Sequence, residues 1–220
     1  MAPSGRVSSG VTCIDTLLDG GWPQGRISEV FGPPSSGKTS LALTLLATAT
    51  RRGEVVACVD VADALHPASL VAAGAELQRV LWVRPPSPTD GVRCTELLLQ
   101  AGGFTLVVLD LGMRPPRRLR GHIWPRLLHG AERSHTALVV LASQRLTGSC
   151  AALGLRMQLR AACWQRGLWP LFDGFDTTVL LARNKLGPPG GRTSFRIGQP
   201  ASSRHVPSPP RGGRAGWGGG

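Results

Sequence analysis

Several features are scarce in this 220-residue chain, and the lack of long apolar stretches, of a secretory signal and of paired cysteines each excludes a class of protein. The chain has no tyrosine, 13 acidic residues against 25 basic ones, and two lysines, Lys38 and Lys185. No apolar stretch approaches the roughly 18 residues of a membrane-spanning helix, so we expect no membrane contact. The N-terminus lacks the features of a secretory signal, and a cytoplasmic location is expected. The five cysteines are odd in number and lack a CxxC pair, which argues against a disulfide framework and a zinc site.

Positive charge gathers in the second half of the chain. The net charge is −2 over residues 1–113, +9 over residues 114–166 and +5 over residues 167–220, for a formal net charge of +12. An excess of this size favours a polyanionic partner, most simply nucleic acid, and an acidic partner protein is the alternative.

One globular domain with a tail is the expected organisation. A chain of this length can build one sizeable core but not two full domains. Residues 199–220 consist mostly of Pro, Gly, Ser and Arg, with almost nothing to bury. We therefore predict a globular domain over residues 1–198 and a disordered basic tail over residues 199–220.

Short apolar runs alternate with helical segments along the domain. The runs predict strands at residues 27–31, 55–59, 106–109, 138–141 and 178–181, and the segments between them predict helices at residues 40–51 and 68–76. This alternation predicts an α/β fold with a mostly parallel, twisted sheet and helices on both faces. Residues 153–164 also have the pattern of a helix, with Arg156 and Arg160 on one stripe.

The sharpest motif follows the predicted strand at residues 27–31. It fits the phosphate-binding pattern GxxxxGK[ST], and a predicted helix begins directly after it at Ser40. Glycines in such a loop let backbone N–H groups point at a phosphate, while the lysine and the helix N-terminus stabilise the negative charge. We predict an ATP site formed by Gly32, Pro33, Pro34, Ser35, Ser36, Gly37, Lys38 and Thr39.

A nucleotide site of this kind also needs Mg²⁺ and an acid on a neighbouring strand. Asp110 ends a run of apolar residues and is the best candidate, and the Thr39 hydroxyl is the second predicted Mg²⁺ ligand. Asp60 follows the run at residues 55–59 and is another strand-end acid on the same side of the predicted sheet. None of these carboxylates is obviously placed to orient an attacking water.

These residues resemble the core of the RecA recombinase family. The likeness extends over about residues 7–198 and is most specific at the phosphate loop and at Arg183, Asn184 and Lys185. It implies a RecA-like P-loop NTPase core. Within that superfamily, Gly21-Trp22-Pro23 and residues 70–85 are closer to the ImuA-type proteins, which are RecA-like accessory factors of the bacterial error-prone DNA synthesis complex.

The resemblance implies a role for several single residues. Lys38 would act on the phosphates, and Gln144 would sense the γ-phosphate and signal to the DNA-binding loops. Arg183 and Lys185 would reach the ATP of a neighbouring subunit, in the manner of an arginine finger supplied in trans.

Two departures from the RecA pattern affect the predicted chemistry. Ala62 occupies the position of the water-activating Glu, and the adjacent Asp63 is the nearest substitute, although a shift of one residue re-aims a side chain. Ser69 falls where RecA has an aromatic side chain that stacks on adenine. No polymerisation helix and strand precede Val7, which also counts against a self-assembling strand-exchange filament.

Arginines that follow the Asp110 strand form the predicted DNA contact. The resemblance places one of the DNA-binding loops of RecA at this point, next to the nucleotide site. Guanidinium groups there can hold phosphates, and Trp124 can stack on a base. The candidate DNA-binding residues are Arg114, Arg117, Arg118 and Arg120.

Four functions are compatible with the sequence. The leading hypothesis is a RecA-like ATP-binding protein of DNA repair, recombination and SOS damage-induced mutagenesis, an accessory of translesion synthesis with weak or absent hydrolysis. It would bind ATP, Mg²⁺, single-stranded DNA and either SOS and translesion proteins or RecA-type neighbours, with a homo-oligomer as one option. The alternatives are a DNA-dependent ATPase recombinase, a P-loop small-molecule kinase, and a scaffold with a vestigial phosphate loop. Ala62 leaves open whether the chain is an enzyme.

Overall fold

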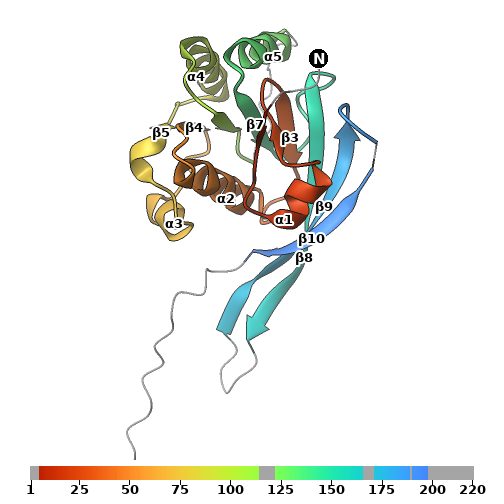
Figure 1. Cartoon of the computed structure of the whole chain (residues 1–220). Coiled ribbons are helices and arrows are strands. Elements are labelled where there is room, and N and C mark those ends of the chain that lie inside the picture. The colour runs from red at the N-terminus through yellow and green to blue at the C-terminus, as the bar shows by residue number, and fades with distance from the viewer. Residues whose placement is uncertain (1–4, 114–121, 166–170, 189, 198–220) are drawn as a thin grey trace, which may run out of the picture.

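An eight-stranded sheet forms the centre of the computed structural model, which describes residues 5–113, 122–165, 171–188 and 190–197. Its strand order is β10-β9-β8-β3-β7-β6-β4-β5 (Figure 1). The strands are β3 (Ile27–Phe31), β4 (Val56–Asp60), β5 (Val80–Val83), β6 (Leu106–Asp110), β7 (Ala137–Ala142), β8 (Ala151–Gln165), β9 (Leu171–Asn184) and β10 (Arg192–Ile197).

The sheet has a parallel part and an antiparallel edge. Six strands run parallel to one another, in the order β5, β4, β6, β7, β3 and β8. The next strand, β9, pairs antiparallel with both β8 and β10. A separate two-stranded sheet pairs β1 (Arg6–Val7) with β2 (Trp22–Pro23). The parallel part brings the carboxyl ends of β3, β4 and β6 to one edge, where α/β sheets bind their ligands.

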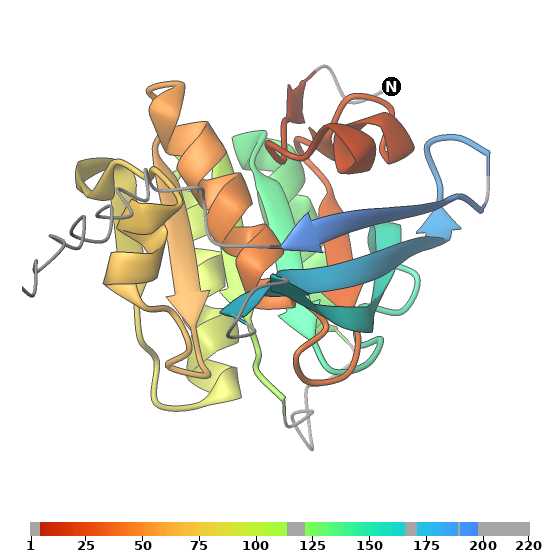
Figure 2. The same ribbon diagram turned by 90° about the horizontal axis from the view of Figure 1, so that it is seen from below.

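Helices cover both faces of the sheet and divide the core in two. One apolar cluster joins α1 (Thr12–Leu17), α2 (Lys38–Arg51) and α3 (Pro67–Ala72) to residues such as Val30 and Val108. The other joins α4 (Pro88–Ala101) and α5 (Ile123–Ser134) to residues such as Val107 and Leu138. Adjacent residues of β6 thus face opposite layers, as the two-residue period of a strand requires. The arrangement confirms the expected α/β fold (Figures 1 and 2).

The prediction of a helix over residues 153–164 is wrong, because this segment lies within β8. Leu153, Leu155 and Met157 are buried against the α2 side, while Arg156 is exposed, which is a strand period of two. The segment alternates apolar and polar residues as well as showing a helical stripe, and pairing with β3 and β9 selects the strand.

The predicted helix at residues 68–76 is shorter than expected. α3 ends at Ala72, because Gly74 has a left-handed backbone (φ 87°) that does not continue a helix. A 3-10 turn at Leu77–Arg79 then leads into β5. Among the described residues, none of the helices is both long enough and apolar enough to cross a membrane.

Candidate nucleotide site

The phosphate loop connects β3 to α2, where the motif predicts it. Gly37 has a left-handed backbone (φ 90°), and a Cβ atom there would lie 2.2 Å from Cδ1 of Ile197. A Cβ atom on Gly32 would lie 2.2 Å from the carbonyl oxygen of Met157. Gly32 is therefore required by the close approach of the β8 backbone, and Gly37 is required by its left-handed backbone.

Lys38 is buried and is bonded to its own loop. Its Nζ donates hydrogen bonds to the carbonyl oxygens of Gly32 and Pro33, each at 2.8 Å, and to Oγ of Ser36 at 3.2 Å. Burial lowers the pKa of the ammonium group, and the nearby Asp110 carboxylate partly opposes this shift. The lysine thus holds the loop closed around the position that a phosphate would occupy.

The two strand-end acids have different environments. Asp60 and Asp110 are register partners on β4 and β6. The carboxylate of Asp60 accepts hydrogen bonds from the N–H groups of Ala64 (3.0 Å) and Leu65 (2.8 Å), which fix the turn after β4. Asp110 accepts one from the N–H of Gly112 at 2.8 Å. Burial, and secondarily the charge of Asp60, raises the pKa of Asp110. A bound cation would lower this pKa again, because it favours the ionised carboxylate.

A cavity of about 230 Å³ lies between the phosphate loop and the ends of β4 and β6. It brings together the ammonium group of Lys38, the hydroxyls of Ser36 and Thr39, and the carboxylate of Asp110. This donor set fits the phosphates of a nucleotide together with one divalent cation. The lining residues are Ser35, Ser36, Gly37, Lys38, Thr39, Ser40, Ala62, Ala64, Asp110, Gly112, Met113 and Phe175.

The side of the cavity where a water-activating acid is expected is apolar. Ala62 and Ala64 line it, whereas Asp63 between them does not. Asp63 has a left-handed backbone (φ 50°), and its exposed carboxylate lies 3.7 Å from a guanidinium nitrogen of Arg84. Among the described residues that line the cavity, Asp110 carries the carboxylate.

Gln144, the predicted γ-phosphate sensor, is exposed just after β7. The loop that follows it is fastened by Glu29, a fully buried residue of β3. The Glu29 carboxylate accepts hydrogen bonds from the N–H groups of Leu146 (2.5 Å) and Thr147 (3.0 Å) and from Oγ1 of Thr147 (2.8 Å). Sequence reasoning missed Glu29, although a charged residue inside an apolar strand is a signal that could have revealed it.

Arg183 and Lys185 contact the same loop from the end of β9. The Arg183 guanidinium donates to the carbonyl oxygen of Gly148 at 2.6 Å, and Nζ of Lys185 donates to that of Ser149. Both basic side chains therefore contact their own chain in this structure. Their predicted contact with the ATP of a neighbouring subunit stays a prediction.

The predicted DNA-binding arginines, Arg114, Arg117, Arg118 and Arg120, lie outside the described residues, as does the predicted tail at residues 199–220. The prediction that Trp124 stacks on a base is wrong, because this side chain is 6% exposed and packs in the core beneath α5.

A second group of arginines lies on the open face of the antiparallel edge. Arg156 of β8 and Arg192 of β10 both pair in register with Leu180 of β9, so the three side chains share one face. It is opposite the buried Leu155 and Met157, and Arg156 and Arg192 are exposed. Sequence reasoning singled out Arg156 but missed Arg192, since only the strand register places them together.

Two further arginines flank an acid on the same edge. Arg196 of β10 donates to the Asp176 carboxylate at 3.0 Å, and this hydrogen bond is the main reason why the pKa of Asp176 is lowered. Arg160, at an irregularity of β8, also acts on Asp176 through its charge. Four arginines thus extend across β8 and β10.

Comparison with known proteins agrees with this geometry. The RecA N-terminal domain family matches residues 4–125, which is more than half of the chain. The chain belongs to the RecA family. Protein RecA of Prochlorococcus marinus (strain MIT 9211) is 31% identical over 150 residues, which is 67% of this chain and 40% of that protein. Protein RecA of Corynebacterium pseudotuberculosis (strain C231) is 29% identical over 229 aligned positions, covering 89% of this chain and 62% of that protein.

The fold of this RecA family member extends beyond the matched residues. The crystal structure of the RadB recombinase superposes with a TM-score of 0.69 and 24% sequence identity, covering 88% of this chain and 97% of that one. This likeness supports a RecA-like architecture over most of the chain. The chain spans between about 40% and 62% of the length of the two RecA proteins.

Proposed function

We propose that this RecA family member binds ATP with Mg²⁺ and DNA, acts in repair and recombination, and hydrolyses ATP slowly or not at all. The observation that carries the proposal is the composition of the cavity at the phosphate loop. Lys38, Thr39 and Asp110 provide the groups for nucleotide and metal, while Ala62 lies where an activating acid would be required.

Nucleotide binding would exchange one set of contacts for another. Lys38 would give up its bonds to the Gly32 and Pro33 carbonyl oxygens and donate to phosphate oxygens, at little cost because the loop is already formed. Thr39 and Asp110 would hold Mg²⁺, which when bound supplies positive charge that stabilises the phosphates. The raised pKa of Asp110 would fall, since the cation favours the ionised carboxylate.

Slow hydrolysis follows from the side chains that face the cavity. The methyl group of Ala62 can neither accept a proton nor orient a water molecule. The Asp63 carboxylate is exposed and paired with Arg84, so it does not replace the missing acid in this conformation. ATP would then act mainly by binding and stabilising one conformation, and not through its hydrolysis.

DNA would bind along basic surface that flanks the cavity. Arg156, Arg160, Arg192 and Arg196 cross the open face of β8 and β10, and the predicted loop arginines at residues 114–120 follow β6. Guanidinium groups spread over an exposed sheet suit the phosphates of a flexible single strand. A role as accessory factor in SOS translesion synthesis, in the cytoplasm, is the finer form of this proposal and rests on the ImuA-type resemblance.

Assembly with another RecA-type subunit is part of the same proposal. Arg183 and Lys185 would have to exchange the carbonyl oxygens of Gly148 and Ser149 for the phosphates of a neighbour. Contact with a neighbour would thereby release Gly148 and Ser149, while Glu29 would still hold Leu146 and Thr147.

ATP turnover and ATP binding by the purified chain, with and without single-stranded DNA, test the proposal. Binding without turnover, lost in Lys38→Ala, is the expected result. Rapid DNA-stimulated turnover would contradict slow hydrolysis and favour a DNA-dependent ATPase recombinase. Wild-type DNA binding by a double Arg156→Ala, Arg192→Ala variant would remove the sheet face from the DNA surface.

The Ala62→Glu variant tests the missing acid directly. If the remaining geometry is intact, turnover is expected to rise by about tenfold or more, because a positioned general base contributes on the order of 10² to 10⁴ in rate. Ala62→Gln is the matched control, as it adds the same bulk without the carboxylate. Equal turnover in the two variants would contradict this explanation.

A further inference from the structure

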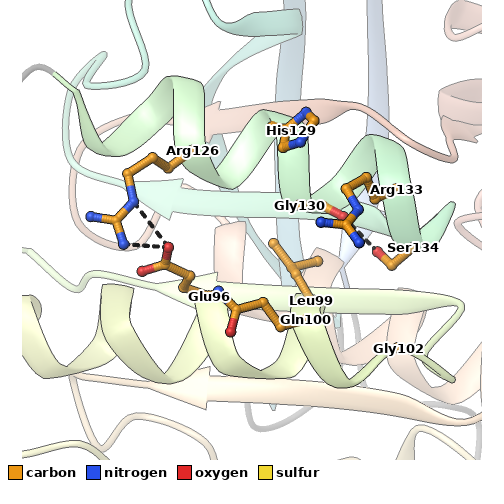
Figure 3. Close-up of a pocket in the computed structure, with 9 residues that line it drawn as sticks. All are labelled: Glu96, Leu99, Gln100, Gly102, Arg126, His129, Gly130, Arg133 and Ser134. Atoms are coloured by element: carbon orange, nitrogen blue, oxygen red, sulfur yellow. Dashed lines mark hydrogen bonds and ion pairs between the residues drawn. The ribbon is translucent and has the colours of Figure 1, made fainter.

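A groove between α4 and α5 lies on the face of the sheet opposite α2 (Figures 1 and 3). It consists of two adjoining hollows of about 470 Å³ and about 370 Å³, which share Glu96 and Arg126 as lining residues. The larger hollow is lined by Glu96, Leu99, Gln100, Gly102, Arg126, His129, Gly130, Arg133 and Ser134, as Figure 3 shows. The nucleotide site and the arginines of β8 and β10 contribute nothing to it.

Close packing of the two helices fixes the floor of the groove. A Cβ atom on Gly130 of α5 would lie 3.2 Å from Cβ of Leu99 on α4, so the helices approach closely here. Leu99 is buried beneath the larger hollow, and Val92 and Leu127 are buried beneath the smaller one. The groove therefore has an apolar floor that does not depend on the conformation of its rim.

The rim of the groove is cationic. Arg93, Arg126 and Arg133 face one acidic residue, Glu96. The Glu96 carboxylate is already paired with Arg126, at 3.0 Å from its Nε and 2.5 Å from its Nη2 (Figure 3). Within the described part of the chain, neither Arg93 nor Arg133 has an ion-pair partner. Two exposed guanidinium groups are thus available above an apolar floor.

We propose that this groove binds an acidic, amphipathic segment of another protein. Carboxylates of the segment would pair with Arg93 and Arg133, and an apolar side chain would fill the larger hollow beside Gly130. An extended stretch or one helical turn has the size to occupy the two hollows.

Charge argues that the segment comes from a different chain. The 13 acidic residues of this protein are scattered, and three of them fall within ten consecutive residues only at 54–63, where Asp60 is buried at the end of β4. Its C-terminal residues 199–220 contain three arginines and no acid, so they would be repelled by the rim. A nucleic-acid duplex is a poorer match, because its phosphates would satisfy the arginines but its paired bases are not free to enter the two hollows. Single-stranded DNA, whose bases are free, is distinguished by the experiment below.

Binding of a labelled probe peptide to the full-length protein tests this proposal. The probe is a 15-residue peptide with glutamates on one helical face and leucines on the other, and fluorescence anisotropy of its label measures binding. In the reference peptide, every glutamate is replaced by glutamine. We expect the acidic probe to bind and the glutamine peptide to bind at least about tenfold more weakly. Equal binding of the two peptides would overturn the role of the arginines.

Two variants locate the binding site. Arg133→Glu reverses one free charge, and Gln100→Trp fills the larger hollow without changing charge. Each is expected to weaken probe binding by about tenfold, whereas Arg52→Glu, an exposed arginine at the end of α2, is the control and should leave it unchanged. Weakening by Arg52→Glu equal to that by Arg133→Glu would show a diffuse charge effect and overturn the site.

The same variants separate this proposal from the proposed function. ATP binding is expected to be unchanged in Gln100→Trp, because the cavity at the phosphate loop shares no lining residue with the groove. Single-stranded DNA binding is expected to be unchanged as well, because Gln100 lines the larger hollow, whereas His122 and Ile123, which follow the predicted DNA-binding arginines, line the smaller one. Oligo(dT) could also compete with the probe for wild-type protein and fail to bind the Arg133→Glu variant. That result would assign the groove to nucleic acid and overturn the protein-segment proposal.

Discussion

The loop after β3 and the loop after β7 are held in place in opposite ways. The first, at residues 32–37, is fastened by Lys38, whose ammonium group bonds to carbonyl oxygens a few residues away. The second, at residues 146–149, is fastened by Glu29, Arg183 and Lys185, which are distant in sequence. The first loop is a local structure ready for a ligand, and the second depends on the assembled sheet.

Lys38→Ala is expected to have the largest effect, on the first loop. Nucleotide affinity should fall by about a hundredfold, because a charge-assisted contact to phosphate is lost. Stability should change little, because the loss of the hydrogen bonds from Lys38 to the loop is offset by relief of the burial cost that lowers the pKa of its ammonium group. Isothermal titration with ATP and thermal melting of the same samples measure both quantities; a clear drop in melting temperature would contradict a loop that is stable locally.

Glu29→Ala should instead destabilise the second loop. Three donors of Leu146 and Thr147 lose their acceptor in a buried site, at a cost of about 3 kcal/mol. Urea unfolding gives the free energy, and hydrogen exchange should show faster exchange of the Leu146 and Thr147 amides. Glu29→Gln is the control, because its amide oxygen can accept from both N–H groups while its NH2 group donates to the Thr147 hydroxyl, without the charge. If the alanine variant were as stable as wild type, the fastening role of Glu29 would be wrong.

Asp110→Asn probes the electrostatics of the nucleotide site. Because burial raises the pKa of Asp110 above its unfolded value, the protonated form is favoured in the folded protein. The carboxyl group of Asp110 contributes its full stability below the pKa that it has in the unfolded protein. This contribution is lost as the pH rises through the higher pKa that it has in the folded protein. The variant should therefore melt at a higher temperature than wild type near neutral pH, and the difference should shrink at mildly acidic pH. A lower melting temperature near neutral pH would contradict this sign.

Arg183→Ala is expected to have the smallest effect. The half-buried guanidinium makes one hydrogen bond to the Gly148 carbonyl oxygen, worth about 0.5 to 1 kcal/mol at a partly exposed site. Urea unfolding measures the loss, and Arg183→Lys should recover part of it. A loss as large as that of Glu29→Ala would mean that β9 and not β3 is the main support of the second loop.

Much of the fold could be predicted from local patterns. The strand at Ile27–Phe31 has the predicted ends, and the predicted runs at residues 106–109 and 138–141 lie within β6 and β7. Strands β6 and β7 are buried on both faces and are apolar except for Asp110 at the end of β6, which makes them visible in the sequence. β3 departs from this pattern at Ser28 and Glu29. β8 was mistaken for a helix because its residues have apolar spacing of both kinds, and β10 was missed because its exposed residues are polar.

The position of the phosphate loop was predictable and its surroundings were not. The loop could be placed between a strand and a helix because strand, glycine-rich turn and helix N-terminus are contiguous along the chain, and Lys38, Thr39 and Asp110 do line one cavity there. Their roles toward nucleotide and metal stay predictions. The assembled sheet was needed to show that Asp60 supports a turn, that Ala62 and not Asp63 faces the cavity, and that Glu29 fastens a loop more than a hundred residues away. Those contacts depend on strand order and register, which bring together residues that no local pattern connects.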